Sequence, residues 1–86
     1  MLGLNIINTA SNIKVYPNPT NSVVNIESPL SVDIRLTTID GKIVIDSKNV
    51  NVVNLSYLPN GVYLLGIFDG ATGLKIKTER ITKIGD

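Results

Sequence analysis

The chain has 86 residues, of which 43% are hydrophobic and 17% are charged, and its formal net charge is +1. This length suits one domain, and this composition favours a folded chain over a disordered one. The nearly balanced charge provides no global field that would attract nucleic acid or an anionic membrane, so we expect no nucleic-acid partner and no direct membrane insertion.

The N-terminus lacks the basic segment and long apolar run of a signal peptide, and no apolar run approaches the roughly 18 residues of a transmembrane helix. If the domain is exported, we therefore expect the export signal to lie on a longer parent chain.

The apolar residues predict strands. They occur in short runs or alternate with polar residues, and turn residues interrupt them about every 8–12 positions, which is typical of a sandwich or barrel. We expect seven strands and no helix, at residues 13–16, 23–27, 32–39, 42–46, 50–55, 62–68 and 74–84. Residues 1–12 are expected to be a linker or an extra edge strand, and residues 13–86 a single all-β, antiparallel, immunoglobulin-like sandwich.

The first strand leads into a stiff segment, YPNP at 16–19. Pro17 and Pro19 fix φ near −65° and donate no backbone hydrogen bond. Each also moves the residue before it away from the α region. Asn18 and Asn21 suit turns in which a side chain bonds to the nearby backbone. The segment therefore predicts a rigid corner between two strands, with a direct recognition surface as the alternative.

The middle strands have distinct patterns. In the third strand Val32, Ile34 and Leu36 alternate with polar residues, which predicts one buried face. The phase of apolar residues slips within 50–55, so we expect a bulge there or a buried strand. Residues 62–68 are nearly all apolar, which indicates a central strand covered on both faces.

Two turns have recognisable chemistry. Asp40-Gly41 between apolar runs predicts a hairpin with a type I′ turn. In LPNGVY at 58–63, Pro59 suits the second position of a β-turn and Gly61 frees the backbone before the next strand. Tyr63 is placed like the tyrosine whose hydroxyl bonds back to the corner before strand F of immunoglobulin-like sandwiches. We expect it to brace this corner, with a ligand-binding tyrosine as the alternative.

The last strand is basic: residues 75–83 contain one acidic residue, Glu79, and four basic ones, Lys75, Lys77, Arg80 and Lys83. These charges predict either a handle for a protein partner or protection of an edge strand against aggregation. The two roles are compatible, because an edge strand can also recruit a partner by strand addition.

Four stretches, in this order, resemble the C-terminal sorting domain of the type IX secretion system of Bacteroidetes (the type A sorting domain). They are YPNP at 16–19, DGKIV at 40–44, LPNGVYLL at 58–65 and LKIKTERITKI at 74–84. The resemblance covers about residues 13–84. The chain departs from it at the end, where it has KIGD and the family commonly has a Lys- and Val-rich stretch.

The resemblance implies a sandwich that follows a covalently linked N-terminal cargo domain and directs it through the periplasm and the outer-membrane translocon to the cell surface or medium. It also implies cleavage by a sortase-like peptidase, with release or surface attachment of the cargo. The residues that match motif positions are Pro17, Asn18, Pro19, Gly41, Lys42, Gly61, Tyr63, Lys75, Lys77, Arg80 and Lys83.

Catalytic chemistry is not indicated. The sequence has no histidine and no cysteine, so the usual general base and the soft metal ligands are absent. No carboxylate spacing indicates a glycosidase pair, and neither Asp40-Gly41 nor Asp69-Gly70 lies in a calcium-loop pattern. We therefore expect no enzymatic activity, no metal and no cofactor.

Two other functions remain open. An accessory sugar- or protein-binding module is one, although the chain has no tryptophan and only Tyr57 and Phe68 remain for a binding platform once the corner tyrosines are assigned. A passive spacer is the other. A sorting signal must lie at the C-terminus of its parent, whereas the other two can lie anywhere.

Overall fold

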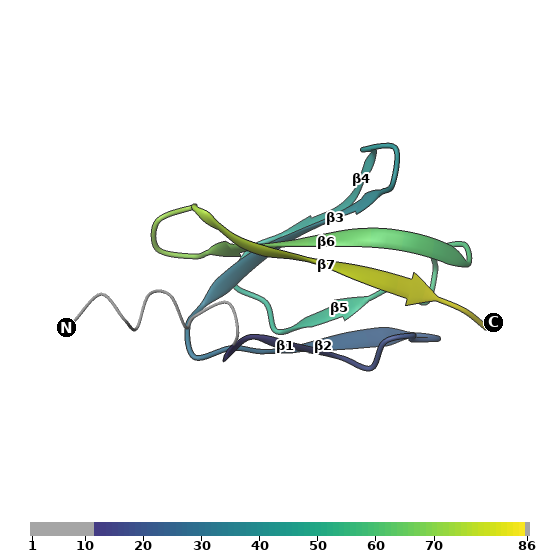
Figure 1. Cartoon of the computed structure of the whole chain (residues 1–86), viewed down its shortest axis with the longest axis horizontal. Coiled ribbons are helices and arrows are strands. Elements are labelled where there is room, and N and C mark those ends of the chain that lie inside the picture. Colours follow the sequence, from purple (N-terminus) through teal and green to yellow (C-terminus); the bar gives the residue numbers. More distant parts are fainter. Residues whose placement is uncertain (1–11, 86) are drawn as a thin grey trace.

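Two antiparallel sheets pack face to face in the computed structural model, which describes residues 12–85 (Figure 1). One sheet has the strand order β1-β2-β5 and the other β4-β3-β6-β7. The strands are β1 (Lys14–Tyr16), β2 (Val23–Glu27), β3 (Val32–Thr38), β4 (Ile43–Ser47), β5 (Val52–Asn54), β6 (Gly61–Asp69) and β7 (Lys75–Lys83). The predicted seven-stranded antiparallel sandwich is confirmed. Residues 1–12 were expected to be a linker or an extra edge strand. Almost all of them, residues 1–11, lie outside the described residues.

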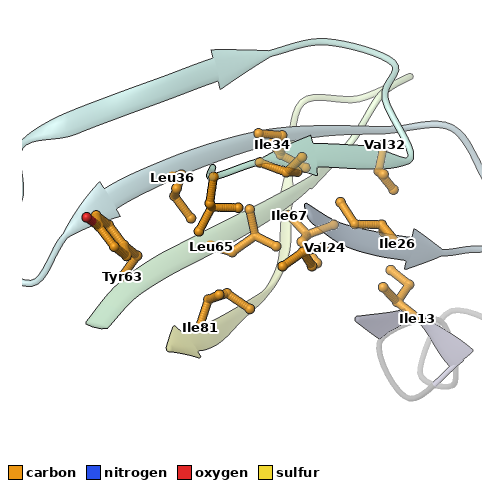
Figure 2. Close-up of a cluster of buried hydrophobic side chains, with 12 residues drawn as sticks. Ile13, Val24, Ile26, Val32, Ile34, Leu36, Tyr63, Leu65, Ile67 and Ile81 are labelled. Carbon is orange, nitrogen blue, oxygen red and sulfur yellow. The ribbon is translucent and has the colours of Figure 1, made fainter. Parts of the chain in front are cut away.

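The inner faces of the sheets form the core, as alternation in the sequence predicts. Val32, Ile34 and Leu36 of β3 are all buried, which confirms the predicted face. Figure 2 shows them beside buried residues of β2, β6 and β7. The complete set of buried apolar side chains is Ile13, Val24, Ile26, Val32, Ile34, Leu36, Val53, Leu55, Tyr63, Leu65, Ile67 and Ile81.

The fifth strand is shorter than expected, and it alternates regularly. The N–H of Val50 donates to the Val32 carbonyl at 3.2 Å, so the chain is still crossing from the larger sheet at that point. In β5 itself, Val52 is exposed and Val53 is buried. The predicted bulge or buried strand at the change of apolar phase within 50–55 is therefore wrong. The register shifts of the larger sheet lie elsewhere, at Leu36/Thr37 and at Ile67/Phe68.

β6 is central, as predicted, but only its inner face is covered by a second layer. On the outer face Leu64 and Phe68 are half-buried, while Gly66 is buried. The Phe68 ring covers this glycine, because a Cβ at Gly66 would lie 3.2 Å from Phe68 Cε1. The long apolar run thus reflects one true core face and one face that is covered by its own side chains.

The hairpin between β3 and β4 forms at Asp40-Gly41, but its turn is not the expected type I′. The N–H of Thr38 donates to the Lys42 carbonyl at 2.9 Å, and that of Gly41 to the Thr38 carbonyl at 3.0 Å, which leaves three residues in the loop. Gly41 has φ +97°, and Asp40 is not among the residues with positive φ. Thr38 Oγ1 donates to the Asp40 carboxylate, and this bond lowers the pKa of the Asp40 carboxyl.

Replacing Gly41 by alanine is expected to destabilise the domain by about 1 kcal/mol, because an L-residue pays roughly that cost for a left-handed conformation. No atom lies within 4 Å of the added Cβ, so the cost comes from the backbone and not from a clash. Urea unfolding followed by circular dichroism measures it. Gly70, whose φ is not positive, is no control, because a Cβ there would lie 2.9 Å from the Ser31 carbonyl oxygen. An unchanged midpoint for Gly41→Ala would contradict the prediction.

Candidate recognition surface

The stiff segment between β1 and β2 lies against the last strand of the chain. The side chain of Asn18 donates from Nδ2 to the Arg80 carbonyl at 2.7 Å, and its Oδ1 accepts from the Thr82 N–H at 3.0 Å. One amide side chain thereby does what the backbone of a neighbouring strand would do. The sequence predicted local turn bonds for Asn18, and its actual partners lie 62 and 64 residues away.

Thr20 continues this contact with its own backbone. Its N–H donates to the Thr82 carbonyl and its carbonyl accepts from the Ile84 N–H, both at 2.9 Å. The pairing is a parallel bridge between Thr20 and Lys83. Residues 17–20, which we call the proline corner, therefore cover the outer edge of β7 from Arg80 onward. Pro17 and Pro19 have no N–H, so this cover does not itself present a full strand edge.

The proline corner and the end of β7 enclose a shallow hollow of about 430 Å³, lined by Pro17, Pro19, Thr20, Asn21, Ile84 and Gly85. Both prolines are exposed, and Ile84 is 51% exposed. The predicted stiff corner thus also presents an apolar surface to solvent. The contributions of Thr20 and Ile84 had no signal in the sequence, because only the fold brings them together.

Tyr63 braces the second corner, as its position predicts. Its ring is 5% exposed in the core, and its hydroxyl donates to the Pro59 carbonyl at 2.5 Å. Figure 2 shows the hydroxyl at one end of the buried cluster. This geometry leaves the ring and the hydroxyl unavailable to a ligand.

Tyr63→Phe is expected to lower the free energy of unfolding by about 1 kcal/mol, the usual net value of such a hydrogen bond. The ring stays, so packing is kept and only the bond to Pro59 is lost. Denaturant unfolding measures the change, with Tyr57→Phe as the control because the Tyr57 side chain is exposed. Equal effects of the two substitutions would show that the corner bond adds nothing.

The basic residues of β7 do not form one surface. Strand register places Lys75 opposite Phe68 and Arg80 opposite Leu64, both on the outer face of the sheet. Lys77 and Lys83 lie on the inner side, opposite Ile67 and Gly61. Simple alternation separates Arg80 from Lys77 and Lys83 but would place Lys75 with those two lysines. The register shift near Lys75 instead puts it on the outer face.

The two inner lysines are structural in character. Lys77 Nζ lies 2.7 Å from Glu79 Oε2 and donates to the Ile13 carbonyl at 3.3 Å, so it joins β7 to the other sheet. Lys83 is 3% exposed. Inward charges and a bulge are two devices that protect an edge strand from pairing with other chains. Lys77 and the bulge protect the first half of β7, and the proline corner covers the second half.

The motif residues gather at one end of the sandwich, which we call the motif end. Lys83 lies between Gly61 and Thr20, and Thr38 of the hairpin pairs with Tyr63. Figure 1 shows the β3–β4 hairpin, the start of β6, the end of β7 and the β1–β2 connection toward the same end of the sandwich. Lys75 and Lys77 are exceptions, because they lie in the far part of β7, opposite Phe68 and Ile67.

The described residues contain neither a cluster of metal-binding side chains nor a helix that could cross a membrane. Within residues 12–85, no group of three or more histidine, cysteine, aspartate or glutamate side chains could hold a metal ion. That part of the chain also has no helix long and apolar enough to cross a membrane. The hollows on its surface are shallow and open.

The protein is a small immunoglobulin-like sandwich, and the proline corner and the end of β7 form a surface at one end of it. The model of the secretion system C-terminal sorting domain family matches residues 14–83, and the chain belongs to this family. It is a type IX sorting domain, and such domains mark proteins for export through the outer membrane to the cell surface or the extracellular space.

A solved structure supports the fold. PorZ, an essential bacterial surface component of the type IX secretion system of Porphyromonas gingivalis, superposes with a TM-score of 0.68 at 20% identity. The match covers 91% of this chain and 12% of that protein, so the chain spans a small part of its length. A search of curated proteins gave no significant match.

Proposed function

We propose that the domain acts without catalysis and carries a covalently linked N-terminal cargo through the outer-membrane translocon of the type IX system. Recognition is by protein–protein contact with the folded domain. A sortase-like peptidase then removes the domain, and the cargo is released or attached to the surface. The gathering of the motif residues at one end of the fold is the observation that carries this proposal.

A folded signal explains why the motif residues are mostly turn formers. Asn18, Gly41, Gly61 and Tyr63 each stabilise a turn or a corner, so their joint effect is the shape of the motif end. A signal read as an extended chain would have no need of such residues. PorZ, a component of the secretion system, contains a sandwich of this kind, which supports the assignment to that system.

An export assay tests the proposal. Residues 1–86 are fused to the C-terminus of a periplasm-targeted fluorescent protein in a bacterium with a type IX system. Fluorescence in the medium and on the cell surface is compared with a strain that lacks the translocon. We expect export that depends on the translocon, and an exported reporter that has lost the domain in a strain with the peptidase. A folded fusion that stays in the periplasm would overturn the proposal.

A further inference from the structure

Three cationic side chains lie on the outer face of the larger sheet. Lys75 and Arg80 come from β7, and Arg35 comes from β3, two strands away. Arg35 lies opposite Gly66, between the rows of the other two cations. In the sequence, Lys75, Lys77, Arg80 and Lys83 form one basic strand. In the fold, Arg35 lies on the outer face with Lys75 and Arg80, whereas Lys77 and Lys83 lie on the inner side.

An aromatic ring and a shallow hollow lie among these cations. The Arg35 guanidinium carbon is 5.6 Å from the centroid of the Phe68 ring, and Lys75 Nζ is 6.0 Å from it. Because Gly66 has no side chain, a hollow of about 160 Å³ remains beside the ring, and the side chains of Thr37 and Thr78 also line it. The hollow has room for a small apolar side chain and for hydrogen bonds to its neighbours.

The positive charge of this face comes mainly from Lys75 and Arg80, because the carboxylates near it pair with other cations. Asp46 Oδ2 lies 3.6 Å from Arg35 Nε, and Asp33 Oδ2 lies 3.8 Å from Lys48 Nζ. Neither Lys75 nor Arg80 has a carboxylate partner among the described residues. The half of the face over β6 and β7 therefore attracts anions.

We propose that this face binds an extended acidic segment of a component of the type IX translocon. Lys75 and Arg80 lie opposite Phe68 and Leu64, four residues apart on β6, which is about 13 Å in a strand. Carboxylates at positions i and i+4 of an extended segment have the same spacing and point to the same side. The side chain at i+2 then enters the hollow beside Phe68, and Arg35 contacts the segment from the other side.

This inference rests on the proposed function, and one export experiment separates the two. In the reporter fusion, Arg35, Lys75 and Arg80 are all changed to Gln. The matched control changes Lys14 to Glu and Lys48 to Gln, which lowers the net charge by the same amount at exposed residues that match no motif position. Since each exposed charge pair changes affinity by up to about fivefold, we expect export of the triple variant to fall about tenfold or more, and that of the control less than twofold.

The outcomes have different meanings. Failure of the unchanged fusion to be exported would overturn the proposed function. Export of the unchanged fusion, together with undiminished export of a folded triple variant, would overturn the docking surface alone. An equal loss in the triple variant and in the control would also overturn it, because only total charge would then matter.

A titration tests the ligand chemistry without the translocon and without relying on the triple variant. The ¹⁵N-labelled chain is titrated with the peptide Ser-Glu-Ser-Val-Ser-Glu-Ser, its Gln analogue, and vesicles containing anionic lipid. We expect the glutamate peptide alone to shift the amide signals of Gly66 and Thr78, and the shift to weaken with salt. Shifts centred on other residues, equal shifts by the Gln peptide, or a preference for vesicles would each overturn the proposal.

Discussion

Replacement of Leu65 by alanine is expected to lower the free energy of unfolding by about 2–5 kcal/mol, the usual cost of removing a buried leucine. Leu65 lies in the central strand β6, is fully buried, and has Leu36 and Glu79 as its cross-strand neighbours. A domain of this size has little stability to lose, since even ordinary domains have only about 5–15 kcal/mol. Chemical denaturation followed by circular dichroism measures the effect.

Leu74→Ala is the matched control, because the same atoms are removed from a side chain that is 70% exposed. We expect its unfolding free energy to stay within about 0.5 kcal/mol of the parent. In the export assay the Leu65 variant tests whether the folded domain is recognised. Full export of a fusion whose domain is demonstrably unfolded would contradict recognition of the fold.

Asn18→Ala is expected to cost about 1–3 kcal/mol, because two hydrogen bonds to β7 are lost and each has a net value of about 0.5–1.5 kcal/mol. The change leaves the Arg80 carbonyl and the Thr82 N–H without their side-chain partner. An uncovered strand edge can pair with another chain, so we also expect the variant to self-associate at high concentration. Denaturation and analytical ultracentrifugation measure the two effects.

Asn21→Ala serves as the control for this corner. Asn21 is exposed in the same segment and lines the adjacent hollow, so its substitution changes the surface without removing a bond to β7. Both effects should be absent from this variant. Identical behaviour of the two asparagine variants would mean that the side chain of Asn18 does not hold the edge.

Most of the fold could be predicted from local patterns in the sequence. Alternation located the inner face of β3, and the apolar run located the central strand β6, because both signals arise within a few residues. The role of Tyr63 could also be predicted, since its hydrogen-bond partner Pro59 is four residues away. The fifth strand begins later than expected because at Val50 the chain still bonds to Val32 of the larger sheet.

Contacts between distant residues could not be predicted from the sequence. Nothing near Asn18 indicates that it bonds to β7, and nothing near Arg35 indicates that it lies beside Lys75 around Phe68. The position of Lys75 on the outer face with Arg80 depends on the register shift between β6 and β7, which changes the alternation between Lys75 and Lys77. These features belong to the packed sandwich, and they are the ones that form the candidate recognition surface.

Because the proline corner bonds to β7, the domain can complete its fold only after its last strand has been synthesised. Early residues Asn18 and Thr20 acquire their partners only when Arg80 to Ile84 have left the ribosome. Ile81 of the same strand also completes the core. A chain that is truncated before β7 therefore lacks both the closed edge and the full interior. The sorting fold can consequently act as a test of completeness, because only a polypeptide translated through its last strand presents a finished export signal.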